Sequence, residues 1–72
     1  MKKEEIIYIN LIQKIAIHKT GQSNNPILNS HIVMLDWVLH ENESARDIRE
    51  IIEDKRYTLK ANEYMRRYST NS

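Results

Sequence analysis

The side chains best suited to chemistry in this chain are its histidines and the one carboxylate that lies a helix turn before one of them. Asp36 and His40 are four residues apart, so a helix would place both on one face, where they could act as a pair of metal ligands. No HExxH pattern accompanies them, and the other imidazoles, His18 and His31, do not complete a ligand set by spacing. An acid one turn before a histidine near a helix end is more often a local charge pair. The sequence therefore predicts no metal site.

Other residue types used in catalysis are sparse. Ser30 and His31 are neighbours in sequence, and neighbouring helical residues point in different directions, so they do not form a nucleophile–base pair. The chain contains no cysteine, which excludes disulfides and thiol chemistry, and a single glycine, Gly21, cannot build a glycine-rich phosphate loop. We therefore expect a protein that is not an enzyme and that holds no cofactor.

The charge of the chain is divided between two blocks. The formal net charge is only +1, but residues 41–54 carry six acids against Arg46 and Arg49, a balance of −4. Residues 55–72 carry five bases against Glu63, a balance of +4. Charge placed in blocks is typical of a surface for a partner, and on helical proteins also of a solvated face.

Two helices are well marked in the first half. Over 3–19 the apolar residues fall at helical spacings on more than one side, and Gly21 then favours a helix end. A second helix is predicted over 26–40, with Asn25 as its N-cap and Pro26 at its first position. Its core stripe consists of Leu28, Ile32, Leu35 and Leu39.

The stretch Ser44–Tyr68 contains no Gly and no Pro, and its apolar pattern decides whether it is one helix or two. At about 100° per residue, the isoleucines of residues 48–52 cluster on one side of a helical wheel, together with Leu59. The other apolar residues of this stretch cluster roughly 150° away: Tyr57, Ala61, Tyr64, Met65 and Tyr68. One straight helix cannot place both clusters against the same core. We therefore predict a break between Glu53 and Thr58.

The resulting fold is all-α, a small bundle of three to four helices in a single domain over residues 1–72. The last two helices are predicted over 45–53 and 58–68. Ser44, followed by Asp47 three residues later, forms a variant capping box at the start of the third helix.

A chain of 72 residues is near the lower limit for a self-sufficient core, and small scaffolds usually need extra support. The first helix is apolar on more sides than one small bundle covers, which predicts a homodimer. We expect the interface to involve Ile7, Leu11 and Ile15, with Trp37 nearby. No stretch approaches the ~18 apolar residues of a membrane span, and no signal-peptide cleavage site follows the first helix, so we expect a cytoplasmic protein with no membrane partner.

The segment "ARDIREIIEDKRYTLKANEY" resembles the helix-turn-helix of small phage and plasmid transcriptional regulators. In that family an Ile or Leu is followed by an "ELLG" turn, and a "TV" or "TL" pair opens the recognition helix. The isoleucines of residues 48–52 match the core positions in the first helix of that motif, and Thr58-Leu59 match its "TV" or "TL" pair. The resemblance implies double-stranded DNA as the partner and a set of residues that face phosphates or base edges, with the last two adding backbone contacts: Lys55, Arg56, Tyr57, Thr58, Lys60, Arg66 and Arg67.

The segment departs from that family at three positions. Arg49 stands where the family has a small residue, Glu53 replaces the turn glycine, and Asp54 replaces the apolar turn residue. Two acids beside a docking surface oppose phosphate binding, and a turn without glycine needs another residue to take the strained angle.

The first half has a resemblance of its own. A long helix, a loop containing Gly and a helix carrying Leu35-Asp36 are similar to the helical hairpin of the sporulation aspartyl-phosphate phosphatases, whose signature is "SQELD". Residues 32–34 are apolar here, where that family has the polar residues that its phosphorylated partner is expected to meet.

Two functions remain open. The first is a small regulatory protein that binds DNA or modulates transcription through a divergent helix-turn-helix in residues 44–68. The alternative is a helical interaction module that regulates another protein, such as a repressor, a kinase or a response regulator, with the helix-turn-helix shape serving only as architecture. The salt dependence of duplex binding separates them, because phosphate contacts give a steep negative slope.

Overall fold

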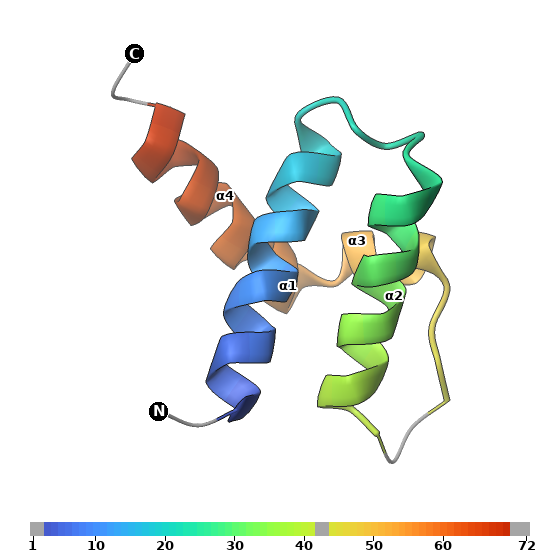
Figure 1. Cartoon of the computed structure of the whole chain (residues 1–72). Coiled ribbons are helices and arrows are strands. Elements are labelled where there is room, and N and C mark those ends of the chain that lie inside the picture. Colours follow the sequence, from blue (N-terminus) through green and yellow to red (C-terminus); the bar gives the residue numbers. More distant parts are fainter. Residues whose placement is uncertain (1–2, 42–43, 70–72) are drawn as a thin grey trace.

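The chain folds into four helices, and its computed structural model describes residues 3–41 and 44–69 (Figure 1). The helices are α1 (Lys3–Lys19), α2 (Pro26–Leu39), α3 (Ile48–Glu53) and α4 (Lys55–Ser69). α1 lies between α2 and α4 and packs against both, and α3 packs against α2 and α4. No strand occurs within these residues, so the predicted all-α class is confirmed. Over the same residues, none of the helices combines the length and the apolar character needed to cross a membrane.

The first two helices form an antiparallel hairpin whose loop follows local sequence signals. Gly21 has a φ of +122°, a conformation that side chains with a Cβ rarely adopt, so the glycine lets the chain leave α1. Asn25 then caps α2, because its side-chain oxygen accepts hydrogen bonds from the backbone N–H groups of Ile27 and Leu28 at 3.1 and 3.2 Å. Pro26 occupies the first position of the helix, as predicted.

The break predicted in the second half is confirmed. α3 ends at Glu53 and α4 begins at Lys55, so Asp54 is the only residue between them that is not helical. The predicted start of α4 at Thr58 is three residues late, because Asp54 already provides the cap from which the helix begins. The turn lets the isoleucines of α3 and the apolar side of α4 reach the same core.

Three further helix bounds differ from the prediction, and one of them is the end of α4, which lies at Ser69, one residue later than expected. α3 begins at Ile48, three residues later than expected, because the N-cap is Asp47 and not Ser44. The Asp47 carboxylate accepts a 2.8 Å hydrogen bond from the Ile48 backbone N–H. α2 ends at Leu39, one residue earlier than expected, with His40 as its C-cap.

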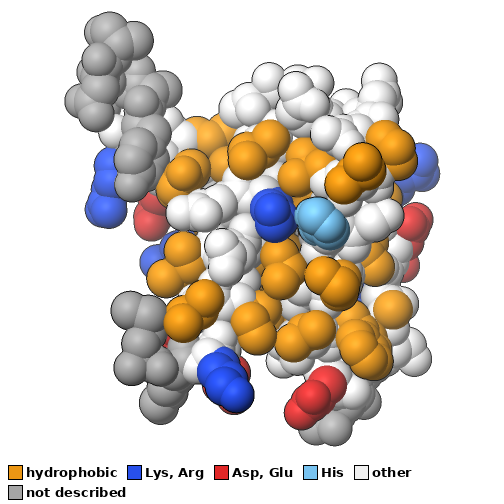
Figure 2. Space-filling model, viewed as in Figure 1, with side chains coloured by type: hydrophobic (Ala, Val, Ile, Leu, Met, Phe, Trp, Pro, Cys, Tyr) orange, Lys and Arg blue, Asp and Glu red, His pale blue; other side chains and the backbone are white. Residues whose placement is uncertain are grey.

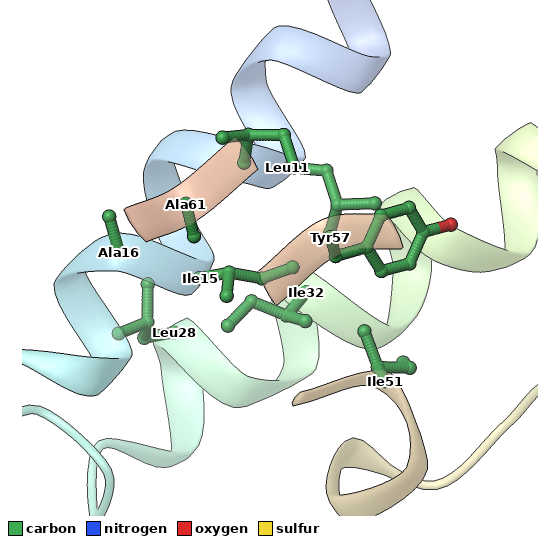
Figure 3. Packing of buried hydrophobic residues seen from close by; sticks show 9 residues of the cluster. Leu11, Ile15, Ala16, Leu28, Ile32, Ile51, Tyr57 and Ala61 are labelled. Carbon is green, nitrogen blue, oxygen red and sulfur yellow. The ribbon is translucent and has the colours of Figure 1, made fainter. Parts of the chain in front are cut away.

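The hydrophobic core lies where α1 faces the other helices (Figure 3). Leu11 and Ile15 are completely buried at its centre, so the prediction that they form a dimer interface is wrong. A side chain with no exposed surface in one copy cannot contact a second copy. Ile7 is half-buried and Trp37 is 48% exposed, so both keep surface in solvent. The buried apolar side chains among the described residues are Leu11, Ile12, Ile15, Ala16, Leu28, Ile32, Ile51, Tyr57 and Ala61.

Candidate nucleic-acid interface

The solvent side of α4 carries the concentrated positive charge of the molecule. Helical spacing places four exposed residues in one line, called here the outer row: Lys55, Leu59, Asn62 and Arg66. A second exposed line, called here the side row, contains Arg56, Lys60, Glu63 and Arg67. The side row borders the groove between α1 and α4. Together the two rows expose five cations and one acid.

The two rows differ in their local ion pairs. In the side row, Arg56 donates from Nη2 and Nε to the carboxylate of Asp54 at 2.9 and 3.2 Å. Lys60 Nζ lies 3.7 Å from Glu63 Oε2. The outer row contains no acid, and its Leu59 is 64% exposed. The two lines therefore carry the same net charge of +2, and they differ in that no acid shares the outer row with its cations.

Asp54 forms the corner between α3 and α4. Its backbone N–H donates to the carbonyl of Ile51 at 3.1 Å, which closes α3. Its own carbonyl accepts from the Thr58 N–H, and its Oδ1 accepts from the Arg56 N–H, both at 2.9 Å, which caps α4. The Thr58 hydroxyl donates to the carbonyl of Ile52 at 3.0 Å, so a carbonyl left unpaired at the end of α3 gains a partner. One residue thus ends one helix and starts the next.

This corner is tighter than the turn of a helix-turn-helix. That motif joins its helices through a turn of about three to four residues that often contains Gly. Here a single aspartate makes the turn in an ordinary extended conformation, with φ −66° and ψ 118°. Neither Glu53 nor Asp54 needs the strained angle that the missing glycine had suggested, because no residue other than Gly21 has a positive φ in the described parts of the chain.

The buried carboxylate of Asp36, which lies behind the corner, connects the first turn of α4 to α2 through hydrogen bonds. Asp36 is 2% exposed, and Arg46 donates to its two oxygens from Nη2 and Nε at 2.7 and 3.1 Å. Arg46 Nη1 also donates to Asp54 at 3.0 Å. Tyr57 donates its hydroxyl proton to Asp36 Oδ1 at 2.7 Å, and His40 Nε2 lies 2.9 Å from the same hydroxyl oxygen. We call these five residues the Asp36 network.

The network shifts the pKa values of its members Asp36, Asp54 and Tyr57. Burial alone would raise the pKa of Asp36, but hydrogen bonds from Arg46 and Tyr57 and the charge of Arg46 hold that pKa below its ordinary value of 3.8. Hydrogen bonds from Arg56 and Arg46 outweigh burial and hold the pKa of Asp54 well below the same value. Burial and the bond to Asp36 raise the pKa of Tyr57 well above 10.0. At neutral pH both acids are charged and the tyrosine is neutral.

The structure divides the residues expected to contact nucleic acid into two groups. Tyr57 is 2% exposed, and its ring packs in the core, so its predicted contact with DNA is wrong. Thr58 is half-buried and uses its hydroxyl proton on the carbonyl of Ile52. Neither residue therefore presents a donor to a ligand. The remaining expected residues all lie on the exposed side of α4: Lys55, Arg56, Lys60, Arg66 and Arg67.

The one candidate pair of metal ligands belongs to the Asp36 network. Asp36 and His40 do share a helix face, with Nε2 at 4.0 Å from Oδ1, but the carboxylate is occupied by Arg46 and Tyr57. Across residues 3–41 and 44–69, no group of three or more metal-ligating side chains gathers. The partners of Asp36 were not predicted from the sequence. The available signal was an acid on the apolar stripe of α2, which indicates a buried carboxylate in need of a donor.

Comparison of the chain with protein-family models, with curated protein sequences and with solved structures found no match.

Proposed function

We propose that the protein is a small regulatory protein that binds duplex DNA through the solvent side of α4. The observation that supports this most directly is the concentration of five exposed cations against one acid on a single helix. Contacts of Lys and Arg with phosphates supply most of the affinity of sequence-independent DNA binding. Lys55 and Arg66 end the outer row about 16 Å apart along the helix, roughly the rise of five phosphates on one strand.

The Asp36 network supports the same function because it holds α4 in one direction. Tyr57 and Asp54 lie at the start of the helix, and both are bonded to residues of other elements. A binding surface that is already ordered loses less conformational entropy when it meets its partner. Arg56 and Lys60 lie near the start of α4, where the residues of a recognition helix reach base edges, so any preference for sequence should depend on these two.

The salt dependence of DNA binding tests the proposal. The affinity for a duplex should fall linearly with salt on logarithmic axes, with a slope of about −0.9 for each phosphate contact. Replacing both ends of the outer row, in the double variant Lys55→Gln with Arg66→Gln, should flatten that slope by about 1.8. The affinity for different duplex sequences should weaken by similar factors.

A matched control removes the same charge from another helix. Lys3 and Lys19 are exposed on α1, so the double variant Lys3→Gln with Lys19→Gln has the same net charge as the α4 variant. We expect the control to keep the wild-type slope. Equal flattening by both variants would show that only net charge matters, and no binding of the wild type at low salt would refute the proposal.

A regulator that acts by binding another protein is the second candidate. It is favoured by apolar side chains that the fold leaves in solvent on α1, where Ile6 and Ile17 are 44% and 45% exposed. Exposed apolar patches are typical of protein interaction sites. This candidate predicts that the α4 variants change neither the stability of the protein nor its binding to a protein partner.

A further inference from the structure

α2 carries a second apolar stripe on the side opposite its buried one. Spacings of three, four and three residues place the main members of this stripe in line, with a neighbour beside the last. We call the set the α2 stripe: Ile27, Ser30, Met34, Trp37 and Val38. Ile27, Met34 and Trp37 are 69%, 53% and 48% exposed. The spacing is that of the contact positions in helices that pack along one another. Figure 2 shows apolar side chains spread over the face built by α1 and α2.

We propose that a second copy of this chain docks on the α2 stripe, with α2 packed antiparallel against α2 of the partner around a two-fold axis. This interface differs from the one expected from the sequence, which centred on the first helix. Trp37 is the residue common to both.

The charge of α2 favours a second copy as the occupant. α2 contains no Lys or Arg, and its only acid, Asp36, is buried and paired with Arg46. Two copies therefore bring no like charges together along the stripe. Two copies that met through α4 would bring together two surfaces of five cations and one acid each, and these would repel. A partner with a charged docking face would find no opposite charge on the α2 stripe.

The stripe is also complementary to itself. In a two-fold contact each pair of facing residues occurs twice, once from each copy. With the axis crossing the exposed side of α2 at the height of residue 32, Ser30 faces the partner's Met34, and Ile27 faces the partner's Trp37. Each layer then pairs a smaller side chain with a larger one, which lets two helices pack closely without leaving a void.

A shallow hollow beside the stripe offers room for side chains of the second copy. It has a volume of about 420 Å³ and lies between α2 and the start of α3. Its walls include Val33, Trp37, Ala45 and Ile48, and none of its lining residues is charged. An apolar side chain from the partner would enter it without burying a charge.

The size of the surface indicates a weak dimer. A stable interface usually takes ~800 Å² from each partner, which is about one seventh of the 5517 Å² that this chain exposes. One face of a helix about 21 Å long, even with the hollow, is smaller than that. The dimer should therefore dissociate on dilution. α4 lies on the other side of α1, so the surface proposed to bind DNA stays open (Figure 1).

Dilution followed by sedimentation and fluorescence tests the proposal. Trp37 is the only tryptophan, so its emission reports directly on this surface. We expect dimers at high concentration, monomers at low concentration, and a shift of the emission to longer wavelength over the same range. Met34→Glu and Ile27→Glu should each remove the association, because each places a carboxylate at an apolar contact. The helical circular dichroism of both variants should match the wild type, since both side chains are exposed.

Ile9→Glu is the matched control. Ile9 is 51% exposed, close to the value for Met34, but it lines the groove on the α4 side of α1. This variant should dimerise like the wild type. A wild type that stays monomeric up to its solubility limit would overturn the proposal, and so would a dimer that survives both glutamate variants. Neither result bears on DNA binding, because the α2 stripe and the cations proposed to bind DNA lie on different helices. The Lys55→Gln, Arg66→Gln variant should therefore dimerise normally.

Discussion

Tyr57 donates a 2.7 Å hydrogen bond to Asp36 although the two are 21 positions apart in sequence. A phenol has one proton to donate, so the Tyr57 oxygen accepts from His40 at 2.9 Å, and Nε2 of His40 carries the hydrogen. The tyrosine ring also lies 5.8 and 5.9 Å from the guanidinium carbons of Arg46 and Arg56. Tyr57 therefore links the start of α4 to the end of α2 and contacts the cations on both sides of the corner.

Tyr57→Phe tests how much the Tyr57 hydroxyl contributes to the stability of the fold. We expect the free energy of unfolding to fall by about 1–2 kcal/mol, because the variant removes a hydrogen bond to a charged, buried carboxylate while Arg46 still pairs with it. Denaturant unfolding followed by circular dichroism measures the change. Tyr8→Phe is the control, since Tyr8 is half-buried beside Tyr57 and lies outside the network. Equal losses in the two variants would contradict the role assigned to Tyr57.

Acid should destabilise the fold through the carboxylates behind the corner. The pKa values of Asp36 and Asp54 are lower in the folded protein than their ordinary value of 3.8. A group of this kind stabilises the fold fully above its unfolded pKa and loses that contribution as pH falls through the folded pKa. We therefore expect the free energy of unfolding to fall as the pH drops below 3.8.

Asp54→Asn separates charge from capping at the corner. Asparagine caps helices as well as aspartate does, so the variant keeps the start of α4 and loses the ion pairs with Arg46 and Arg56. The substitution should lower the free energy of unfolding by about 1–2 kcal/mol at neutral pH. The difference in free energy of unfolding between the variant and the wild type should shrink as the pH falls below 3.8. Glu50→Gln, at an exposed position of α3, is the control. A difference for Asp54→Asn that stays constant with pH would rule out the ionic explanation.

High pH should destabilise the fold through the ionisation of Tyr57. The pKa of Tyr57 is raised above 10.0 in the folded protein, by burial and by its bond to Asp36. A raised pKa stabilises the fold below the unfolded value and loses that contribution as pH rises through the folded one. Tyr57 should therefore ionise above its ordinary value of 10.0, together with unfolding. Tyrosinate absorbance measures this, and Tyr57→Phe should remove this step. A tyrosinate signal that Tyr57→Phe leaves unchanged throughout the titration would disprove it.

The parts of the fold that could be predicted are those that short-range signals control. Gly21 ends α1 and Asn25-Pro26 starts α2, each through the backbone conformation or hydrogen bonds of neighbouring residues. The break near Asp54 was predictable from the change of apolar side. Its exact place depended on Asp54, which acts as the cap of α4. At the start of α3, Asp47 acts as the cap instead of the predicted Ser44.

The Asp36 network was not predictable, because it joins residues that are distant in sequence. Arg46 is ten residues from Asp36 and eight from Asp54. The spacing of Asp36 and His40 correctly placed them on one face, but no local pattern shows that an arginine and a tyrosine occupy the carboxylate. The burial of Leu11 and Ile15 was misjudged for the same reason, since α4 covers a side of α1 that the sequence alone left open.

The two acids next to the basic helix, both expected to oppose DNA binding, have different roles in the structure. Asp54 is bonded to Arg46 and Arg56 and caps α4, so neutralising it also changes the start of the helix. Glu53 is exposed. Glu53→Gln is therefore the cleaner test, and it should tighten duplex binding at low salt. A unit charge ~10 Å from a phosphate costs about 0.4 kcal/mol in water, which corresponds to roughly a twofold change in affinity.

The gain from Glu53→Gln should fade as salt increases, because the Debye length is ~8 Å at physiological ionic strength and exposed charges beyond it are screened. Glu4→Gln makes the same change of net charge at an exposed site in the first turn of α1. If DNA lies along α4, duplex titrations at low salt should show a larger gain for Glu53→Gln than for Glu4→Gln. Equal gains would mean that the duplex responds only to net charge. No gain for Glu53→Gln would place the DNA away from the α3–α4 corner.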